Sequence, residues 1–229
     1  MYEELEISGK RVFIKSFGIS ENPEIIYGFF SSVTEKDLQI MEEKLSDDFK
    51  CNRIKPFILT GLISSDWNKD YSPWKMEKIY KRDEDFSGGG HETLEFVIKS
   101  WIPFMEKIFG DHKKNVMGYS LGGLFAMWLC LETGKFHGVG SLSGSLWFKD
   151  IVKYVKGKEI DRNARVYLSL GENEEKTRNQ IMSKVGDNTR EIYEILRERV
   201  DEITLEMNSG GHFNDVDERV LKGIRWMMR

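Results

Sequence analysis

Cysteine is scarce in this chain, and its scarcity limits how the protein can be held together. Only two cysteines occur among the 229 residues. Cys51 lies in an expected loop and Cys130 in an expected apolar helix, which is typical of free thiols in a reducing compartment rather than of a designed disulfide. Neither cysteine has the spacing of a metal ligand. We therefore expect no disulfide framework and no metal site.

The chain also lacks an excess of positive charge and any long apolar run. Its formal net charge is -4 and its pI is near 5.7, so it offers no electrostatic footprint for nucleic acid. Residues 1–6 are acidic where a secretory signal would be basic and then apolar. No stretch approaches the roughly 20 apolar residues of a membrane span. We expect a cytoplasmic protein that binds neither nucleic acid nor membranes.

The sequence does contain enough apolar residues, 40% of the chain, to bury one sizeable core. We therefore expect a single domain over residues 1–229. Short β-branched or apolar runs predict strands at 11–17, 25–28, 57–63, around 116–117, and at 138–142, 165–170 and 203–207. Helical spacing predicts helices at 34–49, at 92–109 with a kink or fresh start near Pro103, at 124–131, at 177–200 with a break allowed at 186–187, and near the C-terminus through Trp226. This alternation favours an α/β fold with a mostly parallel sheet.

Residues 64–91 interrupt the alternation. The segment combines Trp67 and Trp74 with Pro73 and three consecutive glycines, 88–90. So long an irregular stretch inside a compact domain is usually a functional loop. We interpret it as an active-site loop or lid.

The stretch 115–126 carries the strongest chemical signal, the pattern G-x-S-x-G centred on Ser120. A strand is expected before it and a helix after it, so the serine would stand at the apex of a tight strand-to-helix turn. The backbone N–H of Leu121 would then point to the space beside the Ser120 hydroxyl, where negative charge develops during acyl transfer. The alternative is a glycine-lined turn with a capping serine.

A nucleophilic serine needs an imidazole base, and four histidines are available. His91 lies in the glycine-rich stretch, and His112 and His137 lie in polar connections. His212 follows the last expected strand, and residues just after strand C-termini meet at one edge of a parallel sheet. We predict that His212 is the base, although a lone loop histidine is more often simply solvated.

The acid that orients the histidine should follow the penultimate strand. Glu172, Glu174 and Glu175 all qualify by position. We prefer Glu174, because three residues after Gly171 allow the chain to turn back over the sheet edge. A helix dipole would favour the same acidic run without any catalysis, and a Ser-His dyad stays open.

Gly118–Gly123, the Glu174 loop and Gly210-Gly211-His212 together resemble the "Putative esterase" family of α/β hydrolases, which includes esterase D, enterochelin esterase-like enzymes and mycolyltransferases. The resemblance covers nearly the whole chain. It implies an α/β-hydrolase fold, a three-layer αβα sandwich, and cleavage of carboxylic esters through an acyl-enzyme without a cofactor.

The same resemblance assigns further residues. The glycine that ends an early strand in the family corresponds to Gly28, which makes the backbone N–H of Phe29 the second oxyanion donor. Residues 67–74 resemble the family's active-site loop, so Trp67 and Trp74 are expected to contact substrate. Trp147 resembles an aromatic residue over the pocket.

Two alternatives to hydrolysis stay open at this stage. Acyl transfer to a hydroxyl acceptor would use the same residues, and a catalytically silent hydrolase-fold protein would only bind. The expected partner is a small-molecule ester. Acetyl, feruloyl, siderophore trilactone and thioester substrates are all compatible with the sequence, and no oligomeric state is indicated.

Overall fold

The computed structural model describes residues 2–31 and 33–229, and one large sheet organises them. Eight strands pair in the order β1-β2-β4-β3-β7-β8-β9-β10. The pairs β1/β2 and β2/β4 are antiparallel, and every other neighbouring pair is parallel. The strands are β1 (Tyr2–Ile7), β2 (Lys10–Phe17), β3 (Glu24–Phe29), β4 (Phe57–Ile63), β7 (Lys114–Tyr119), β8 (Gly138–Leu142), β9 (Arg165–Gly171) and β10 (Glu202–Asn208).

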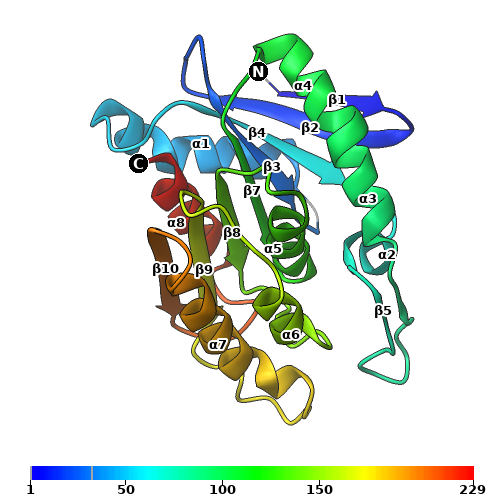
Figure 1. The fold of residues 1–229 in the computed structure, drawn as a ribbon. Helices are drawn as coiled ribbons and strands as arrows, with labels where there is room; N and C mark the ends of the chain where they lie inside the picture. The colour runs from blue at the N-terminus through cyan, green and yellow to red at the C-terminus, as the bar shows by residue number, and fades with distance from the viewer. Residues whose placement is uncertain (1, 32) are drawn as a thin grey trace.

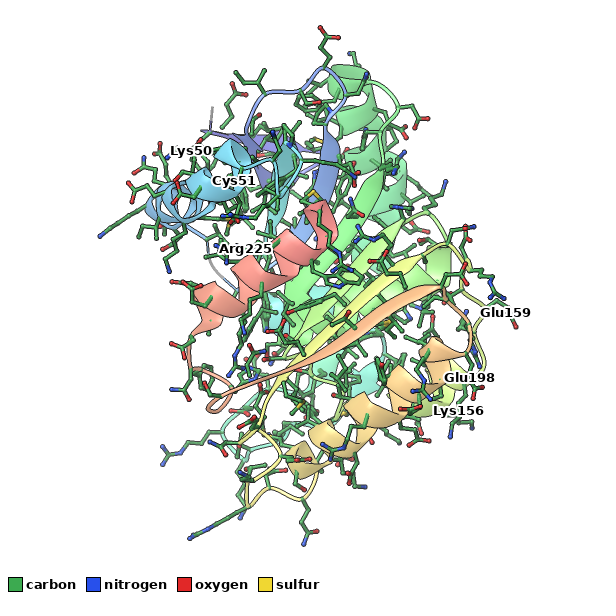
Figure 2. The ribbon with its side chains drawn as sticks, turned by 90° about the vertical axis from the view of Figure 1, so that its left-hand side faces the viewer. Lys50, Cys51, Lys156, Glu159, Glu198 and Arg225 are labelled. Carbon is green, nitrogen blue, oxygen red and sulfur yellow. The ribbon has the colours of Figure 1, made fainter. Side chains whose placement is uncertain are left out.

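Helices cover both faces of this sheet. The helices are α1 (Glu35–Lys50), α2 (Trp67–Tyr71), α3 (Gly90–Phe96), α4 (Ile102–Phe109), α5 (Leu121–Thr133), α6 (Ile151–Lys156), α7 (Val185–Arg197) and α8 (Val216–Met228). One core cluster joins the sheet to α3–α7, and a second joins it to α1 and α8. Figure 2 shows the sheet between these two layers, with Arg225 of α8 on one side and Lys156 and Glu198 on the other. The expected three-layer αβα sandwich is confirmed.

The parallel strands are apolar on both faces because both faces are covered. All residues of β4 except Ile63 are buried, and α5, which packs under the sheet, is buried from Leu121 through Leu131. This explains why α5 shows no polar face in the sequence. None of the helices in the described part of the chain is long and apolar enough to cross a membrane.

Three sequence expectations need correction. The first concerns β1, which was not expected because its sequence is dominated by glutamates. It is an edge strand that pairs only with β2, so its side chains are largely exposed to water and need not be apolar.

The expected helix at 177–200 is wrong in its first part, since α7 begins only at Val185, after a 3₁₀ turn at Met182–Lys184. The side chain of Asn179 accepts hydrogen bonds from the N–H groups of Ile181 and Met182. Such local bonds compete with helical ones. No break occurs at residues 186–187.

The segment 64–91 is less irregular than expected. It contains α2, capped by the Asp66 side chain, and the short antiparallel pair β5 (Lys75–Met76) and β6 (Phe86–Ser87). Figure 1 shows this hairpin projecting beyond α2. The helical stretch that follows runs without interruption from Gly90 to Phe109, so it does not begin afresh at Pro103. A π-helical turn at Val97–Trp101 joins α3 to α4 just before this proline.

Candidate active site

Ser120 stands between the end of β7 and the start of α5, with φ 57° and ψ -123°. A non-glycine residue rarely adopts a positive φ, and such strain is tolerated where surrounding contacts enforce it. A Cβ on Gly122 would lie 2.0 Å from the carbonyl oxygen of Phe29, and one on Gly118 would lie 2.2 Å from that of Gly122. Only glycine fits at either position, so the turn around Ser120 requires both glycines of the G-x-S-x-G pattern.

His212 lies within hydrogen-bond distance of both predicted partners. Its Nε2 is 3.0 Å from the Oγ of Ser120, and its Nδ1 is 2.7 Å from Oε2 of Glu174. The His212 side chain is 25% exposed, whereas that of Glu174 is 4% exposed. The structure thus brings the three residues into one hydrogen-bonded line that runs from the surface to a buried carboxylate.

The loop after β10 fixes the histidine. The N–H of Gly211 donates to Oδ1 of Asn214 at 2.8 Å, which tightens the turn around His212. The hydroxyl of Tyr119, the residue before the nucleophile, donates to the carbonyl of His212 at 2.6 Å. The backbone of the histidine is therefore tied directly to the strand that carries Ser120.

The three candidate glutamates have different environments. Burial by itself raises the pKa of Glu174, but hydrogen bonds with His212 and the N–H of Gly171 outweigh it, and the pKa is lowered overall. Glu172 is exposed. Glu175 pairs with Arg190 of α7 at 2.6 Å. Of the three, only Glu174 contacts the histidine.

Sequence reasoning missed several groups around this line. Arg219 of α8 donates to Oε1 of Glu174 at 3.0 Å. Ser145, three residues after the end of β8, has its hydroxyl 3.5 Å from that of Ser120, and its N–H donates to the carbonyl of Ser120 at 2.9 Å. An arginine in the first turn of a helix is normally exposed, so the sequence did not indicate that Arg219 is buried at the site. A serine in a Ser-Gly-Ser stretch predicts only a loop, so the sequence did not indicate that Ser145 lies beside Ser120.

The two proposed oxyanion donors lie on either side of this turn. Leu121 is the first residue of α5, so its N–H has no acceptor within the helix. Phe29 is the last residue of β3, and its side chain packs against Tyr71, Trp101 and Phe125. The Phe29 ring therefore belongs to the core, and the role of its N–H stays a prediction.

The three tryptophans expected at the substrate site differ in position. Trp74 donates to the carbonyl of Lys149 at 3.0 Å and packs on Phe148, and Trp67 packs edge-on against Tyr71 at 4.7 Å. Trp147 lines an open cavity of about 1050 Å³ between the β5–β6 hairpin, α6 and α7. Neither Ser120 nor His212 lines this cavity, so substrate contact by the three tryptophans stays a prediction.

A second cavity, of about 310 Å³, lies on the other face of the sheet. Its wall is formed by Tyr119, Leu59 of β4, the loop residues Phe30, Ser31 and Val33, and side chains of α1 and the first half of α8. Within the described residues, no three His, Cys, Asp or Glu side chains are grouped so that they could hold a metal ion.

Residues 23–215 match the family described as "Putative esterase", and the chain belongs to this family. The fold is that of the α/β hydrolases, and the enzyme class is carboxylic ester hydrolase. A curated relative is "Uncharacterized protein YbbA" of Bacillus subtilis (strain 168), 24% identical over 208 residues that cover 86% of this chain and 82% of the relative.

Solved structures share the fold at lower identity. An IroE-like serine hydrolase from Shewanella oneidensis has a TM-score of 0.78 and 17% identity, with 100% of this chain and 80% of the other covered. The siderophore hydrolase EstB from Aspergillus nidulans has a TM-score of 0.73 and 16% identity, with 100% and 94% covered. The fold expected from the sequence resemblance is confirmed.

Proposed function

We propose that this esterase is a serine hydrolase that uses Ser120 as nucleophile, His212 as general base and Glu174 as the acid that orients His212. The observation that carries the proposal is the unbroken hydrogen-bonded line from Ser120 through His212 to Glu174, at 3.0 and 2.7 Å. Nε2 of His212 takes the hydroxyl proton as the oxygen of Ser120 attacks the ester carbonyl. Glu174 stabilises the imidazolium that forms.

The tetrahedral intermediate places negative charge on the former carbonyl oxygen. The N–H groups of Leu121 and Phe29 are the proposed donors to this oxygen, and the N-terminus of α5 adds its dipole. His212 then protonates the leaving alcohol, and an acyl group remains on Ser120. Water activated by the same imidazole releases the acid and restores the enzyme.

The test is the replacement Ser120→Ala, measured with a short activated ester such as p-nitrophenyl acetate. Loss of a nucleophile in such a triad costs several orders of magnitude in rate, so we expect no turnover above background while the melting temperature is retained. Brief reaction of the wild type followed by acid quench should show, by intact mass, one acyl group that is absent from Ser120→Ala. Full activity in the variant would rule out this site.

Two structural neighbours are named as siderophore hydrolases, so esters of siderophores are the first natural substrates to test. The panel should pair a siderophore trilactone with acetyl, feruloyl and thioester substrates at matched concentrations. Adding a hydroxyl acceptor and looking for the transferred product distinguishes hydrolysis from acyl transfer. Inactivity across the panel, together with no acyl-enzyme, would favour a silent binding protein.

A further inference from the structure

Arg219 is an unusual residue because its charged side chain is 1% exposed. Among the described residues it is the only arginine buried to this degree. It lies on α8, one turn after the loop that carries His212. A buried cation is costly unless hydrogen bonds and an anion compensate it, so its partners indicate why it is there.

The guanidinium joins four separate parts of the chain. Its Nη1 donates to Glu174, to the hydroxyl of Ser143 after β8 at 2.9 Å, and more weakly to the hydroxyl of Tyr119 at 3.4 Å. Its Nη2 donates to the carbonyls of Ser209 and Gly211, at 3.1 and 2.8 Å. The acid, the histidine loop and the residue before the nucleophile therefore share one donor.

The two oxygens of the Glu174 carboxylate have different partners. Oε1 accepts from Arg219 and from the N–H of Gly171, at 3.0 and 2.7 Å. Oε2 is left to face Nδ1 of His212. Because both oxygens are held, the carboxylate cannot rotate away from the imidazole.

The arrangement is not the one that stability alone would select. Nε of Arg219 is buried and has no hydrogen-bond partner among the described residues. Replacing a buried ion pair by apolar residues of similar volume is often neutral or stabilising. An incompletely satisfied cation kept at this place points to a function in geometry.

We propose that Arg219 is a positioning residue of the active site, which holds the Glu174 carboxylate and the Gly211–His212 backbone in register with Ser120. This inference rests on the proposed triad. It goes beyond the triad because it makes α8, which touches none of the reacting atoms, part of the catalytic geometry.

The arrangement also places charge beside the base. The Glu174 carboxylate faces the guanidinium through Oε1 and Nδ1 of His212 through Oε2, and the Tyr119 hydroxyl lies against the same guanidinium. Removing the guanidinium therefore changes the charge around the imidazole as well as its position, so the pH profile of kcat/KM is a readout that a purely structural role would not change.

The experiment compares Arg219→Lys and Arg219→Met with Arg225→Met. Arg225 lies on the same helix but bonds to Asp48 and the carbonyl of Lys44, both in α1, and to no residue of the proposed triad. For Arg219→Met we expect kcat to fall by about 10- to 100-fold with KM changed less than about threefold, since a misplacement of about 1 Å can cost that much. The pH profile of kcat/KM for Arg219→Met should also differ from that of the wild type. Arg219→Lys should recover part of kcat, and Arg225→Met should change neither quantity.

A second measurement, proton NMR of the folded enzyme without substrate, does not depend on turnover or on how much protein folds. The Nδ1 proton of His212, shared with Glu174, should give a low-field proton resonance in the wild type. We expect it to shift or broaden in Arg219→Lys and to persist in Arg225→Met.

Folded Arg219→Met or Arg219→Lys with wild-type kcat, pH profile and resonance would overturn the inference and leave Arg219 a structural residue. If Arg219→Met does not fold, Arg219→Lys alone decides between these outcomes. Failure of the proposed function has a different signature, because Ser120→Ala would then stay active while Arg219 is intact.

Discussion

Two regions of the molecule are built in different ways. In the first, the loops after β9 and β10 and the start of α8 form what we call the acid–histidine side, where a buried carboxylate, a buried guanidinium and backbone carbonyls are linked by hydrogen bonds of 2.6–3.1 Å. In the second, the segment 64–91 and Trp147 form what we call the aromatic side. There Phe86 packs against Trp147 and Phe148, at centroid distances of 5.9 and 5.3 Å.

This contrast indicates a division of labour. Hydrogen bonds have narrow geometry, so the acid–histidine side can hold reacting groups in one arrangement. Aromatic contacts tolerate a range of orientations, so the other side can change its surface while the catalytic geometry is kept. We therefore expect substitutions on the acid–histidine side to change kcat and substitutions on the aromatic side to change substrate preference.

After Ser120→Ala, the largest effect should come from Glu174→Ala, which removes the buried carboxylate of the acid–histidine side. We expect kcat to fall roughly 10³- to 10⁴-fold, the scale seen when the acid of such a triad is lost. Glu175→Ala is the matched control, because Glu175 pairs with Arg190 and does not contact His212. Steady-state kinetics with p-nitrophenyl acetate measures both. Small and equal losses in Glu172, Glu174 and Glu175 variants would point to a Ser120-His212 dyad.

The aromatic side should respond differently at Trp147 and Trp74. Trp147 lines the open cavity, so Trp147→Ala should change the ranking of ester substrates, by about tenfold in relative kcat/KM. Trp74 bonds to Lys149 and packs on Phe148 and Tyr154, so Trp74→Ala should also cost about 3 kcal/mol of unfolding free energy. Trp147 packs on Phe86 and Phe148 but makes no such hydrogen bond, so Trp147→Ala should cost less. Urea denaturation and the substrate panel separate the two effects. An unchanged ranking in both variants would place the substrate elsewhere, with the 310 Å³ cavity beside Tyr119 as the next candidate.

The sequence predicted the parts of the fold and site that depend on local rules. Gly118 and Gly122 indicated the turn because no larger residue fits there, and the order of strands indicated where His212 and Glu174 would meet. Arg219 could not be predicted in this way, since three of its side-chain partners, Tyr119, Ser143 and Glu174, lie 100, 76 and 45 residues away in the sequence. The edge strand β1 was missed because its sequence is not apolar. It pairs with β2 alone, and most of its side chains reach water, so it does not need apolar residues.

The stability of the acid–histidine side should depend on pH in a defined direction. The lowered pKa of Glu174 means that its ionised form is favoured by folding, so its contribution is present above the ordinary value of about 4.5 and is lost as the pH falls through the lower folded value. Glu174→Gln lacks this contribution at every pH and leaves Arg219 without its anion. We expect the wild type to melt several degrees higher than Glu174→Gln at pH 7. The difference should shrink as the pH falls below about 4.5.

Differential scanning fluorimetry from pH 7 to pH 3 measures this difference, and shared losses from other carboxylates cancel between the two proteins. Glu175→Gln serves as the control, because it removes a pair at the surface. A gap between wild type and Glu174→Gln that stays constant down to pH 3 would contradict an ionised, folding-coupled Glu174.

The smallest expected effect concerns Tyr119, which joins the nucleophile's strand to the histidine loop. Tyr119→Phe keeps the ring in the core and removes only the hydroxyl that donates to the carbonyl of His212 at 2.6 Å. One hydrogen bond of this kind is worth about 1 kcal/mol, so kcat should fall about fivefold if the bond helps to hold His212 in place. The matched control is Tyr167→Phe, which removes a hydroxyl bonded to Glu206 at 2.6 Å without touching the loop. Both variants should lose similar stability, but only Tyr119→Phe should lose turnover. Equal kcat values in the two variants would show that the His212 loop is held without the hydrogen bond from Tyr119.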